Sequence, residues 1–562
     1  MFSSAKAFDE ERFKRIIAVV IAVITLIAAG LAFLQSDASA RDDRANRDTK
    51  RYATEAMGHK VSGDARVNFD YNSAYQSWYE LDTLASSATS RGDTAAAARY
   101  TKLRDEMTSL SPLLAAPYFD PAKGQPDIAR YEADVYLVEM TALNEKFVAA
   151  SSVKDAWDAK ANAYVFHLTL LAVAFFLFGL SITIANSFTR WIFSGVGAVV
   201  TVVATGMAIT TWVQTVPDLR DQGTAIDAYA RGVGLAHQEH WDAAIAAYGE
   251  ALQTVPSYAT VYVARAEAYT QQDKHPQAIA DFERARVEGN QSASVAGDLA
   301  WAYYLQGRFD DATNMNRIAL TTGPDELWIQ FDLGLSLLAA GQIDMAKAEY
   351  AKGMEFAAKQ VADARAANQE VPSFLWWSLD DAALSIDSLL STLESGEGTP
   401  PRDKVADPKM VAPAGQVLNE QLKSLAVALE YTGKPPAGSI AAKMSPFQFS
   451  ASEKDDQGNP IDPVIADSFP YGTAEVLVTF DYAGMQDGQD VLYKVYIDGE
   501  EDPSWRLAAP WDLGASGTAE KPLSLAYSDV FVLTPGQYTI EMYVNSHLVQ
   551  QGSFVVEKGE TS

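Results

Sequence analysis

Few residues of this 562-residue chain have the types and spacing that chemistry requires. His237 and His240, with Glu239 between them, come nearest to a metal-binding pair, but no third ligand with suitable spacing is evident. The segment 455–462 (DDQGNPID) offers oxygen ligands of the kind that calcium prefers, although it departs from the twelve-residue calcium-binding loop. We interpret the histidines as exposed turn residues and the acidic segment as a solvated loop, so the sequence predicts no metal and no cofactor.

The motifs of known catalytic sites are missing as well. The sequence contains no nucleophile elbow, phosphate-binding glycine loop or dinucleotide fingerprint. Cysteine is absent, which excludes disulfides, thiol catalysis and zinc–thiolate sites. No pair of carboxylates stands out among the 73 acidic residues as an acid–base couple. The sequence therefore predicts a protein that is not an enzyme.

The chain is strongly acidic, with 73 acidic and 44 basic residues and a formal net charge of −29. Nucleic acids require clustered Lys and Arg, so we expect no nucleic-acid partner. The same charge disfavours electrostatic docking on anionic lipid.

A period of 34 residues begins at residue 225 and runs four times without insertion or deletion. Such a period predicts stacked helical hairpins, because one hairpin cannot bury its apolar face without a neighbour. Small residues occupy two matched positions and mostly aromatic residues a third: Ala244, Ala278, Ala312 and Ala346; Ala251, Ala285, Ala319 and Gly353; Tyr248, Phe282, Asn316 and Tyr350.

The repeats resemble the tetratricopeptide repeat (TPR) family over residues 225–358. Pro256 and Pro324 fall at the family's helix-ending proline, and Gly307 and Gly341 at its turn glycine. The resemblance implies an α-solenoid that binds proteins. Three positions depart from the family pattern: Asn290, Asn316 and Arg231.

In this family the first helix of each hairpin lines a concave groove. The resemblance implies that the groove is aromatic and mildly acidic and lacks a Lys and Arg cluster, so an apolar or basic segment of a protein partner is its expected ligand. The groove residues that it implies are Tyr229, Val233, His237, Glu267, Asp298, Trp301, Tyr304, Trp328, Phe331 and Asp332.

Three apolar stretches, 16–34, 164–185 and 191–213, are each long enough to cross a bilayer as a helix. None contains Asp, Glu, Lys or Arg, whereas transport pathways usually need such groups. We interpret the stretches as anchors. A cleaved signal peptide is the alternative for the first, since Ala38-Ser39-Ala40 resembles a cleavage site.

The charges beside these stretches predict the orientation. Lys14, Arg15 and Arg190 lie closest and favour a cytoplasmic N-terminus with the repeats outside the cytoplasm. The opposite orientation would make the chain a cytoplasmic-facing assembly factor for membrane complexes. Basic residues further from the first stretch favour that inverted arrangement: Arg41, Arg44, Arg47, Lys50 and Arg51.

Residues 35–163 show helical rather than strand-like periodicity, as in Tyr71, Tyr75 and Trp78, and predict a helical bundle next to the membrane. After the repeats, 361–394 predicts capping helices. Their Trp376 and Trp377 have a second interpretation, in which they occupy the chain's own groove. Prolines and glycines mark a linker at 395–442, with a short helix over 416–431.

From residue 444 the apolar period changes to two, as in Val476, Val478 and Phe480, which predicts an antiparallel β-sandwich. The segment 533–538 (LTPGQY) resembles the lead into the penultimate strand of bacterial immunoglobulin-like surface domains. Trp505 and Trp511 are expected at one end of the sandwich, where a carbohydrate platform stays open.

The sequence thus predicts a multidomain, multi-pass membrane protein that acts as an extracytoplasmic scaffold. A sensor that signals through a membrane partner, and a self-assembling surface protein or other homo-oligomer, are the alternatives. The expected parts are a cytoplasmic N-terminus (1–15), transmembrane helices (16–34, 164–185, 191–213), a helical bundle (35–163), four TPR repeats (225–360), capping helices (361–394), a linker with a short helix (395–442) and an immunoglobulin-like β-sandwich (443–562).

Overall fold

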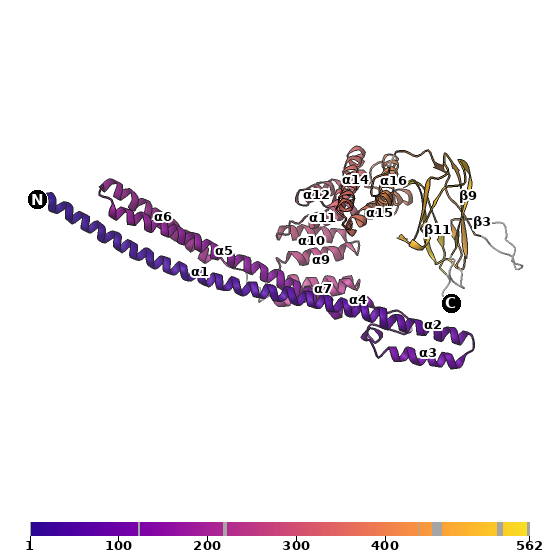
Figure 1. Ribbon diagram of the computed structural model, residues 1–562, viewed down its shortest axis with the longest axis horizontal. Coiled ribbons are helices and arrows are strands. Elements are labelled where there is room, and N and C mark those ends of the chain that lie inside the picture. Colours follow the sequence, from indigo (N-terminus) through magenta and orange to yellow (C-terminus); the bar gives the residue numbers. More distant parts are fainter. Residues whose placement is uncertain are drawn as a thin grey trace. The chain divides into compact units, whose positions relative to one another are not determined.

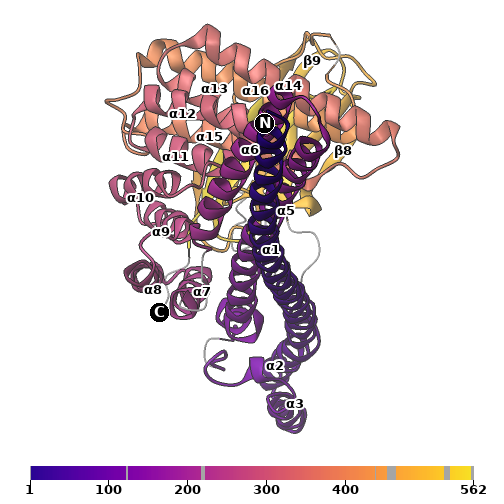
Figure 2. The same cartoon turned by 90° about the vertical axis from the view of Figure 1, so that its left-hand side faces the viewer.

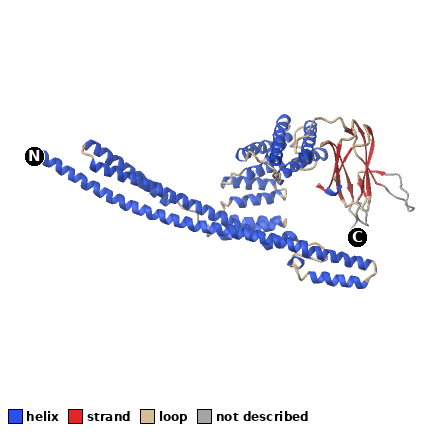
Figure 3. Cartoon of the chain, in the orientation of Figure 1, coloured by secondary structure: helices blue, strands red, loops and turns tan. Residues whose placement is uncertain are grey.

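The computed structural model describes residues 2–121, 124–216, 222–436, 438–451, 464–524 and 532–558 (Figure 1). The acidic segment 455–462 lies outside these ranges. Helices fill the chain up to residue 432, and strands follow (Figure 3). The chain divides into two compact units, residues 1–274 and 275–562.

The first unit is built on very long helices, because no proline occurs between residues 1 and 111 or between 127 and 216. Helices α1 and α5 run side by side, as both views show (Figures 1 and 2). The elements are α1 (Phe2–Phe69), the π-helix η1 (Asp70–Tyr75), α2 (Gln76–Ser90), α3 (Thr94–Met107), the 3-10 helix η2 (Pro112–Leu114), α4 (Ile128–Glu132), the π-helix η3 (Ala133–Leu137), α5 (Val138–Thr183) and α6 (Ser187–Val213).

Three helices of the described chain are long and apolar enough to cross a membrane: Glu10–Ser90, Ile128–Thr183 and Ser187–Val213. Their apolar parts pack into one cluster, which includes Ile24, Leu171 and Ala204. Basic and aromatic side chains meet at both ends of this cluster. The Arg190 guanidinium lies 5.1 Å from the ring centre of Phe13 at one end, and that of Arg41 lies 4.8 Å from the ring centre of Trp157 at the other.

Away from the apolar helices, an aromatic cluster joins η1 and α2 to α4 and the loop before it. Tyr75 and Trp78 are buried there against Phe119 and Tyr131. The Tyr131 hydroxyl donates to the buried Asp70 carboxylate at 2.5 Å. The two π-helices η1 and η3 lie in this region, where an extra residue per turn shifts the helix faces.

The helical hairpins follow the 34-residue period to the residue. Helices α9, α11 and α13 begin at 259, 293 and 327, and α8, α10, α12 and α14 begin at 241, 275, 309 and 343. The first unit holds α7 (Gly223–His237), α8 (Trp241–Thr254) and α9 (Ala259–Thr270). The second holds α10 (His275–Val287), α11 (Ala293–Leu305), α12 (Phe309–Thr322), α13 (Leu327–Ala339) and α14 (Ile343–Ala366).

Close helix approach explains why the matched positions carry small residues. The repeated alanines that the period predicts, Ala244 and Ala346 among them, are 0% exposed. Tyr350 covers Gly334 of the preceding helix, where an added Cβ would lie 2.7 Å from the ring. Any larger residue at Gly334 would therefore push the two helices of the hairpin apart.

A further helix pair, α15 (Ser373–Ser395) and α16 (Pro408–Thr432), follows the fourth hairpin. Helix α15 packs against α13, and α16 packs against α14, as the next hairpin of the stack would. Leu375 and Leu379 are buried, whereas Phe374 and Trp377 are about half exposed. The pair therefore caps the stack with its leucines and leaves Trp377 outside.

Helix α16 begins eight residues before the predicted Gln416. Pro408 stands at its first position, and the Asp407 carboxylate caps it by accepting from the backbone N–H of Lys409 at 3.0 Å. Proline is tolerated at that position because its missing N–H would have no helical partner. Pro408 was one of the prolines that predicted a linker over residues 395–442, but in the structure it begins helix α16.

The strands between residues 443 and 556 form two sheets. In one, β1 (Lys443–Met444) and β2 (Gln448–Ala451) follow one edge of β5 (Glu475–Ala483), β3 (Val464–Ile465) pairs with β2, and β9 (Ser516–Ser524) pairs with the other edge of β5. The other has the order β4 (Ser468–Phe469), β11 (His547–Val556), β10 (Gly536–Val544), β6 (Asp490–Ile497) and β7 (Glu500–Glu501), with β8 (Leu507–Pro510) beside β6. The 3-10 helix η5 (Pro503–Trp505) precedes β8.

The two sheets bury one shared core. Val478 and Phe480 of β5 pack in the same cluster as Ile540 of β10 and Phe554 of β11. The predicted period of two is confirmed on β5, where Val476, Val478, Phe480 and Tyr482 are buried. On β10 both faces are buried from Ile540 onward, because α16 packs against this sheet.

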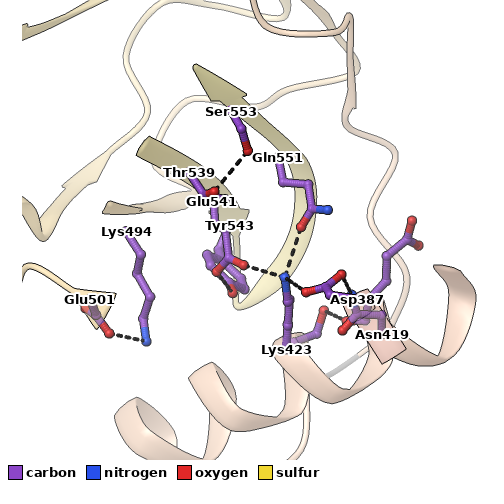
Figure 4. A network of polar contacts seen from close by, with 12 residues as sticks. Asp387, Asn419, Lys423, Lys494, Glu501, Thr539, Glu541, Tyr543, Gln551 and Ser553 are labelled. Atoms are coloured by element: carbon purple, nitrogen blue, oxygen red, sulfur yellow. Dashed lines mark hydrogen bonds and ion pairs between the residues drawn. The ribbon is translucent and has the colours of Figure 1, made fainter. Parts of the chain in front are cut away.

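Charged side chains join α16 to the second sheet (Figure 4). The Lys423 ammonium lies 2.7 Å from Glu541 of β10 and 3.1 Å from Asp387 of α15, and it donates to Gln551 of β11 at 3.0 Å. Burial lowers the pKa of Lys423, but Glu541 and Asp387 outweigh burial and raise the pKa above its ordinary value. Lys423 is therefore a buried cation, charged at neutral pH, that holds the sheet to the helices.

Candidate functional site: the first helices of the hairpins

The predicted groove residues of the first hairpin contact the bundle. On α7, the His237 Nε2 lies 2.7 Å from the Glu132 carboxylate of α4. The Tyr229 ring is partly buried, with its centre 5.9 Å from the centres of Tyr248 and Tyr258, and Val233 belongs to the same cluster. His237 thus joins two parts of the first unit through a hydrogen bond to Glu132.

Helix α5 packs against α7, the first helix of the first hairpin. The buried face of α7 meets α5 at Gly234, where an added Cβ would lie 2.6 Å from Val138. The Tyr258 hydroxyl donates to the Glu145 carboxylate at 2.6 Å. Burial raises the pKa of Glu145, and the Tyr258 hydroxyl opposes that rise. The first hairpin is therefore capped by α5, which supplies the cover that an open stack of repeats needs at its end.

Glu267 of α9 is exposed. Burial is the main reason why the pKa values of the Tyr229 and Tyr248 hydroxyls are raised, and the negative charge of Glu267 raises both further. The structure thus brings Glu267, Tyr229 and Val233 near one another at the start of the stack, within the first unit.

In the second unit, Trp301 and Tyr304 of α11 stack with ring centres 5.1 Å apart and planes at 19°. Trp301 is partly exposed, but Tyr304 is only 3% exposed and continues the contact to Phe309. Phe331 of α13 is 2% exposed and stacks on Tyr350 at 5.6 Å. Tyr304 and Phe331, two of the groove residues that the resemblance implies, are therefore buried, because both rings fill the space between helices of the stack.

Trp328 has a different neighbourhood from Trp301. Its ring covers Gly297 of α11, and its indole N–H donates to Glu326 at 3.2 Å. The side chain packs with Ala293, Ala296 and Ile329. Trp328 therefore contributes to the contact between successive hairpins more than to the groove.

Acidic residues lie on α11 and α13, the first helices of two hairpins in the second unit. Asp298 of α11 and Asp332 of α13 occupy matched positions 34 residues apart, and both are partly buried. Burial raises the pKa of Asp332 well above its ordinary value, and the charges of Asp381 on α15 and of Asp298 raise it further. Burial also raises the pKa of Asp381. We call Asp298, Asp332 and Asp381 the acidic cluster.

Sequence reasoning found Asp298 and Asp332 but missed Asp381. The 34-residue spacing signals the first two, whereas Asp381 lies beyond the last repeat on a helix of different length. Among the described residues, no group of three or more His, Cys, Asp or Glu side chains could hold a metal ion.

Several solved structures resemble parts of this chain. One is YrrB, a TPR protein with an unusual peptide-binding site, with 18% identity, a TM-score of 0.23, and coverage of 30% of this chain and 91% of that one. The TPR domain of Arabidopsis OM64 has 22% identity, a TM-score of 0.18, and coverage of 18% and 86%. MamA from Desulfovibrio magneticus RS-1 has 14% identity, a TM-score of 0.23, and coverage of 33% and 94%. No protein-family model and no curated protein matches the sequence.

Proposed function

We propose that the chain is a membrane-anchored scaffold that binds protein partners on a stack of TPR-like hairpins and catalyses no reaction. One observation carries this proposal. The first hairpin packs on α5, through Tyr258–Glu145 and Gly234–Val138, and the same helix continues to Thr183 as a candidate membrane span. The first hairpin is thereby fixed to a membrane anchor without a flexible linker.

The contact between α7 and α5 also supports the number of spans. Residues 132–146 precede the second apolar stretch, and α7 follows the third, yet they touch. Two segments in contact must lie on one side of a membrane, which requires an even number of crossings between them. Helices α5 and α6 supply two. We place this side outside the cytoplasm, because Lys14, Arg15 and Arg190 lie at the opposite end of the spans.

The binding surface that we propose consists of the groove residues that stay accessible. Trp301 offers a partly exposed aromatic face, and Asp298 and Asp332 on the same inner side add negative charge. An apolar segment with basic residues fits this chemistry.

We assign the β-region an immunoglobulin-like fold and a second interaction role. Tyr538 lies in β10, and Thr534 lies just before that strand. The Tyr538 hydroxyl donates to the backbone carbonyl of Thr534 at 2.9 Å. A tyrosine bonded in this way to the backbone a few residues upstream is a hallmark of immunoglobulin-like domains. This hydrogen bond joins two residues of the motif LTPGQY (533–538) and gives the motif a structural role at the start of β10.

The test is quantitative capture by the full-length tagged chain in detergent. Trp301→Ala should reduce at least one captured protein about 30-fold, the loss expected for a central aromatic contact of about 2 kcal/mol. Trp377→Ala is the matched control, since Trp377 is exposed on the capping helix α15.

Quantitative mass spectrometry of the captured proteins, with circular dichroism to verify folding, measures the effect. If the Trp301 and Trp377 variants capture the same proteins in the same amounts as the original chain, the proposed surface is wrong.

A further inference from the structure

We propose that the β-region binds a small monocarboxylate, an organic anion with a short apolar body, in a cavity between its two sheets. This site is separate from the surface proposed for protein partners, and the inference does not depend on that proposal.

The cavity has a volume of about 200 Å³ and lies beside η5 and β8. Its floor is apolar, and both sheets contribute to it: Val478, Val495, Leu523 and Ile540. These four side chains are at most 3% exposed, whereas Leu507, which lines the same cavity, is 41% exposed. The cavity therefore reaches from the surface into the core of the sandwich, which gives a small ligand a route of entry.

Lys521 of β9 lies on the inner face of its sheet. It is directly opposite the buried Val478 in the register of β5 and β9. Opposed residues of antiparallel strands carry their side chains on the same face of a sheet, so Lys521 faces the core as Val478 does. Its neighbours on that face of β9, Ala519 and Leu523, are buried as well. A lysine thus occupies a position where the alternation of the strand predicts an apolar residue.

The charge of Lys521 has no acidic partner among the residues that the structure describes. Its ammonium lies 5.8 Å from the ring centre of Tyr493, and no carboxylate is among the described side chains that line the cavity. Burial lowers the pKa of Lys521. Arg506 also lines the cavity, but its guanidinium pairs with Glu501 and Glu430 at 2.7 Å each. A partly buried cation without a partner is costly, and a bound anion would offset that cost.

Trp505 supplies a second unsatisfied donor at the same cavity. Its indole nitrogen is buried and has no hydrogen-bond partner in the described part of the β-region. The indole N–H of Trp511, in contrast, donates to the backbone carbonyl of Gly514 at 2.7 Å. A buried N–H without an acceptor destabilises a fold, and a carboxylate oxygen of a ligand would satisfy it.

These groups specify the chemistry of the ligand. Both unsatisfied groups are donors and one of them is charged, so a carboxylate, which has two acceptor oxygens and a negative charge, complements them. An apolar cavity of about 150 Å³ holds benzene, so this cavity accommodates roughly eight non-hydrogen atoms, the size of hexanoate. A sugar is a poorer occupant, because the apolar floor would leave its hydroxyls without partners.

The test compares hexanoate with hexanamide, which has the same shape without the charge, and with acetate, which has the charge without the apolar body. Calorimetry at low ionic strength measures the binding of each probe to the full-length chain in nanodiscs of zwitterionic lipid, with empty nanodiscs as the blank. The chain should bind hexanoate about tenfold or more tightly than either control probe. Equal binding of hexanoate and hexanamide, or of hexanoate and acetate, would overturn the inference.

Lys521→Met replaces the cation by an apolar side chain of similar length. This variant should lose the preference for hexanoate over hexanamide but bind hexanamide as the original chain does, which verifies that the cavity is intact. Lys443→Met removes the same charge from an exposed position of β1, in the same sheet, and should keep the preference. An unchanged preference in Lys521→Met would overturn the inference. So would its loss of hexanamide binding, because Lys521 would then only shape the cavity.

Trp505→Phe removes the indole N–H and keeps an aromatic ring. It should weaken the binding of hexanoate about fivefold or more, which corresponds to the loss of one hydrogen bond to a charged acceptor. Hexanoate affinity equal to that of the original chain would show that the carboxylate does not reach Trp505.

Discussion

At the scale of single residues, the hydroxyl of Tyr258 holds the first hairpin to the bundle. It donates at 2.6 Å to Glu145, a carboxylate whose pKa burial raises. Tyr258→Phe keeps the ring contacts with Tyr229 and removes the donor. We expect a loss of about 1–3 kcal/mol in the free energy of unfolding, because a charged acceptor is left without its partner.

Chemical denaturation of the full-length chain measures this loss. Tyr262→Phe serves as the control, since the Tyr262 hydroxyl bonds only to the backbone carbonyl of Pro256. Equal losses in the two variants would contradict a special role of Glu145.

Asp332 makes a prediction about pH. Its pKa in the folded chain is raised above the ordinary 3.8 by burial, then by Asp381 and Asp298. Between the two values the folded chain binds more protons than the unfolded one, so this group lowers the free energy of unfolding as pH rises. Its stabilising effect is greatest near and below pH 3.8 and is lost as pH rises through the folded pKa.

Asp332→Asn removes that dependence. The variant should exceed the original chain in stability at pH 7, and the difference should shrink as pH falls towards 4. Thermal unfolding of both chains at several pH values measures it. A difference that grows on acidification would contradict the raised pKa.

At the scale of elements, Lys423 joins α16 to the second sheet. Its side chain is 14% exposed and that of Glu541 is 3% exposed, and Glu541 also accepts from the Tyr543 hydroxyl at 2.6 Å. Lys423→Met leaves the buried Glu541 and the partly exposed Asp387 without their cation. We expect a loss of about 3–5 kcal/mol, which is the cost of breaking a buried pair from one side.

Hydrogen exchange should show the loss in β10, β11 and α16 together, since these elements share the contact. Lys409→Met, at an exposed position of α16, is the control. A loss confined to α16 would mean that the sheet is held by its apolar contacts, Val427 with Leu492 and Tyr543, instead.

At the scale of the whole molecule, the prediction concerns the side of the membrane. Since the chain has no cysteine, single cysteines at Ser86, Thr322 and Gln486, all exposed, report their location without background. A membrane-impermeant thiol reagent should label all three in intact cells.

Labelling of all three only after permeabilisation would invert the orientation and favour the cytoplasmic assembly factor. A difference between Ser86 and Thr322 would contradict the two crossings through α5 and α6.

The patterns that the sequence predicts well are those set by neighbours along the chain. The hairpins, the apolar helices and the alternation on β5 follow from periods of 34, 3.6 and 2 residues, which depend on local geometry and on burial of one face. The start of α16 was misplaced because proline punctuates loops and also begins helices, and composition does not separate the two.

Contacts between distant segments escaped these patterns. Glu145 and Tyr258 are 113 residues apart. Helix α15 packs against α13 as a further hairpin would, without keeping the period, and the charge of Asp381 thereby acts on Asp332. Likewise, the resemblance to TPR proteins located Tyr304 and Phe331 on the inner helices but not their burial. Local periodicity fixes which face of a helix is apolar. Which helix covers that face is a property of packing between segments, and here it decided that Tyr304 and Phe331 are buried while Trp301 stays partly exposed.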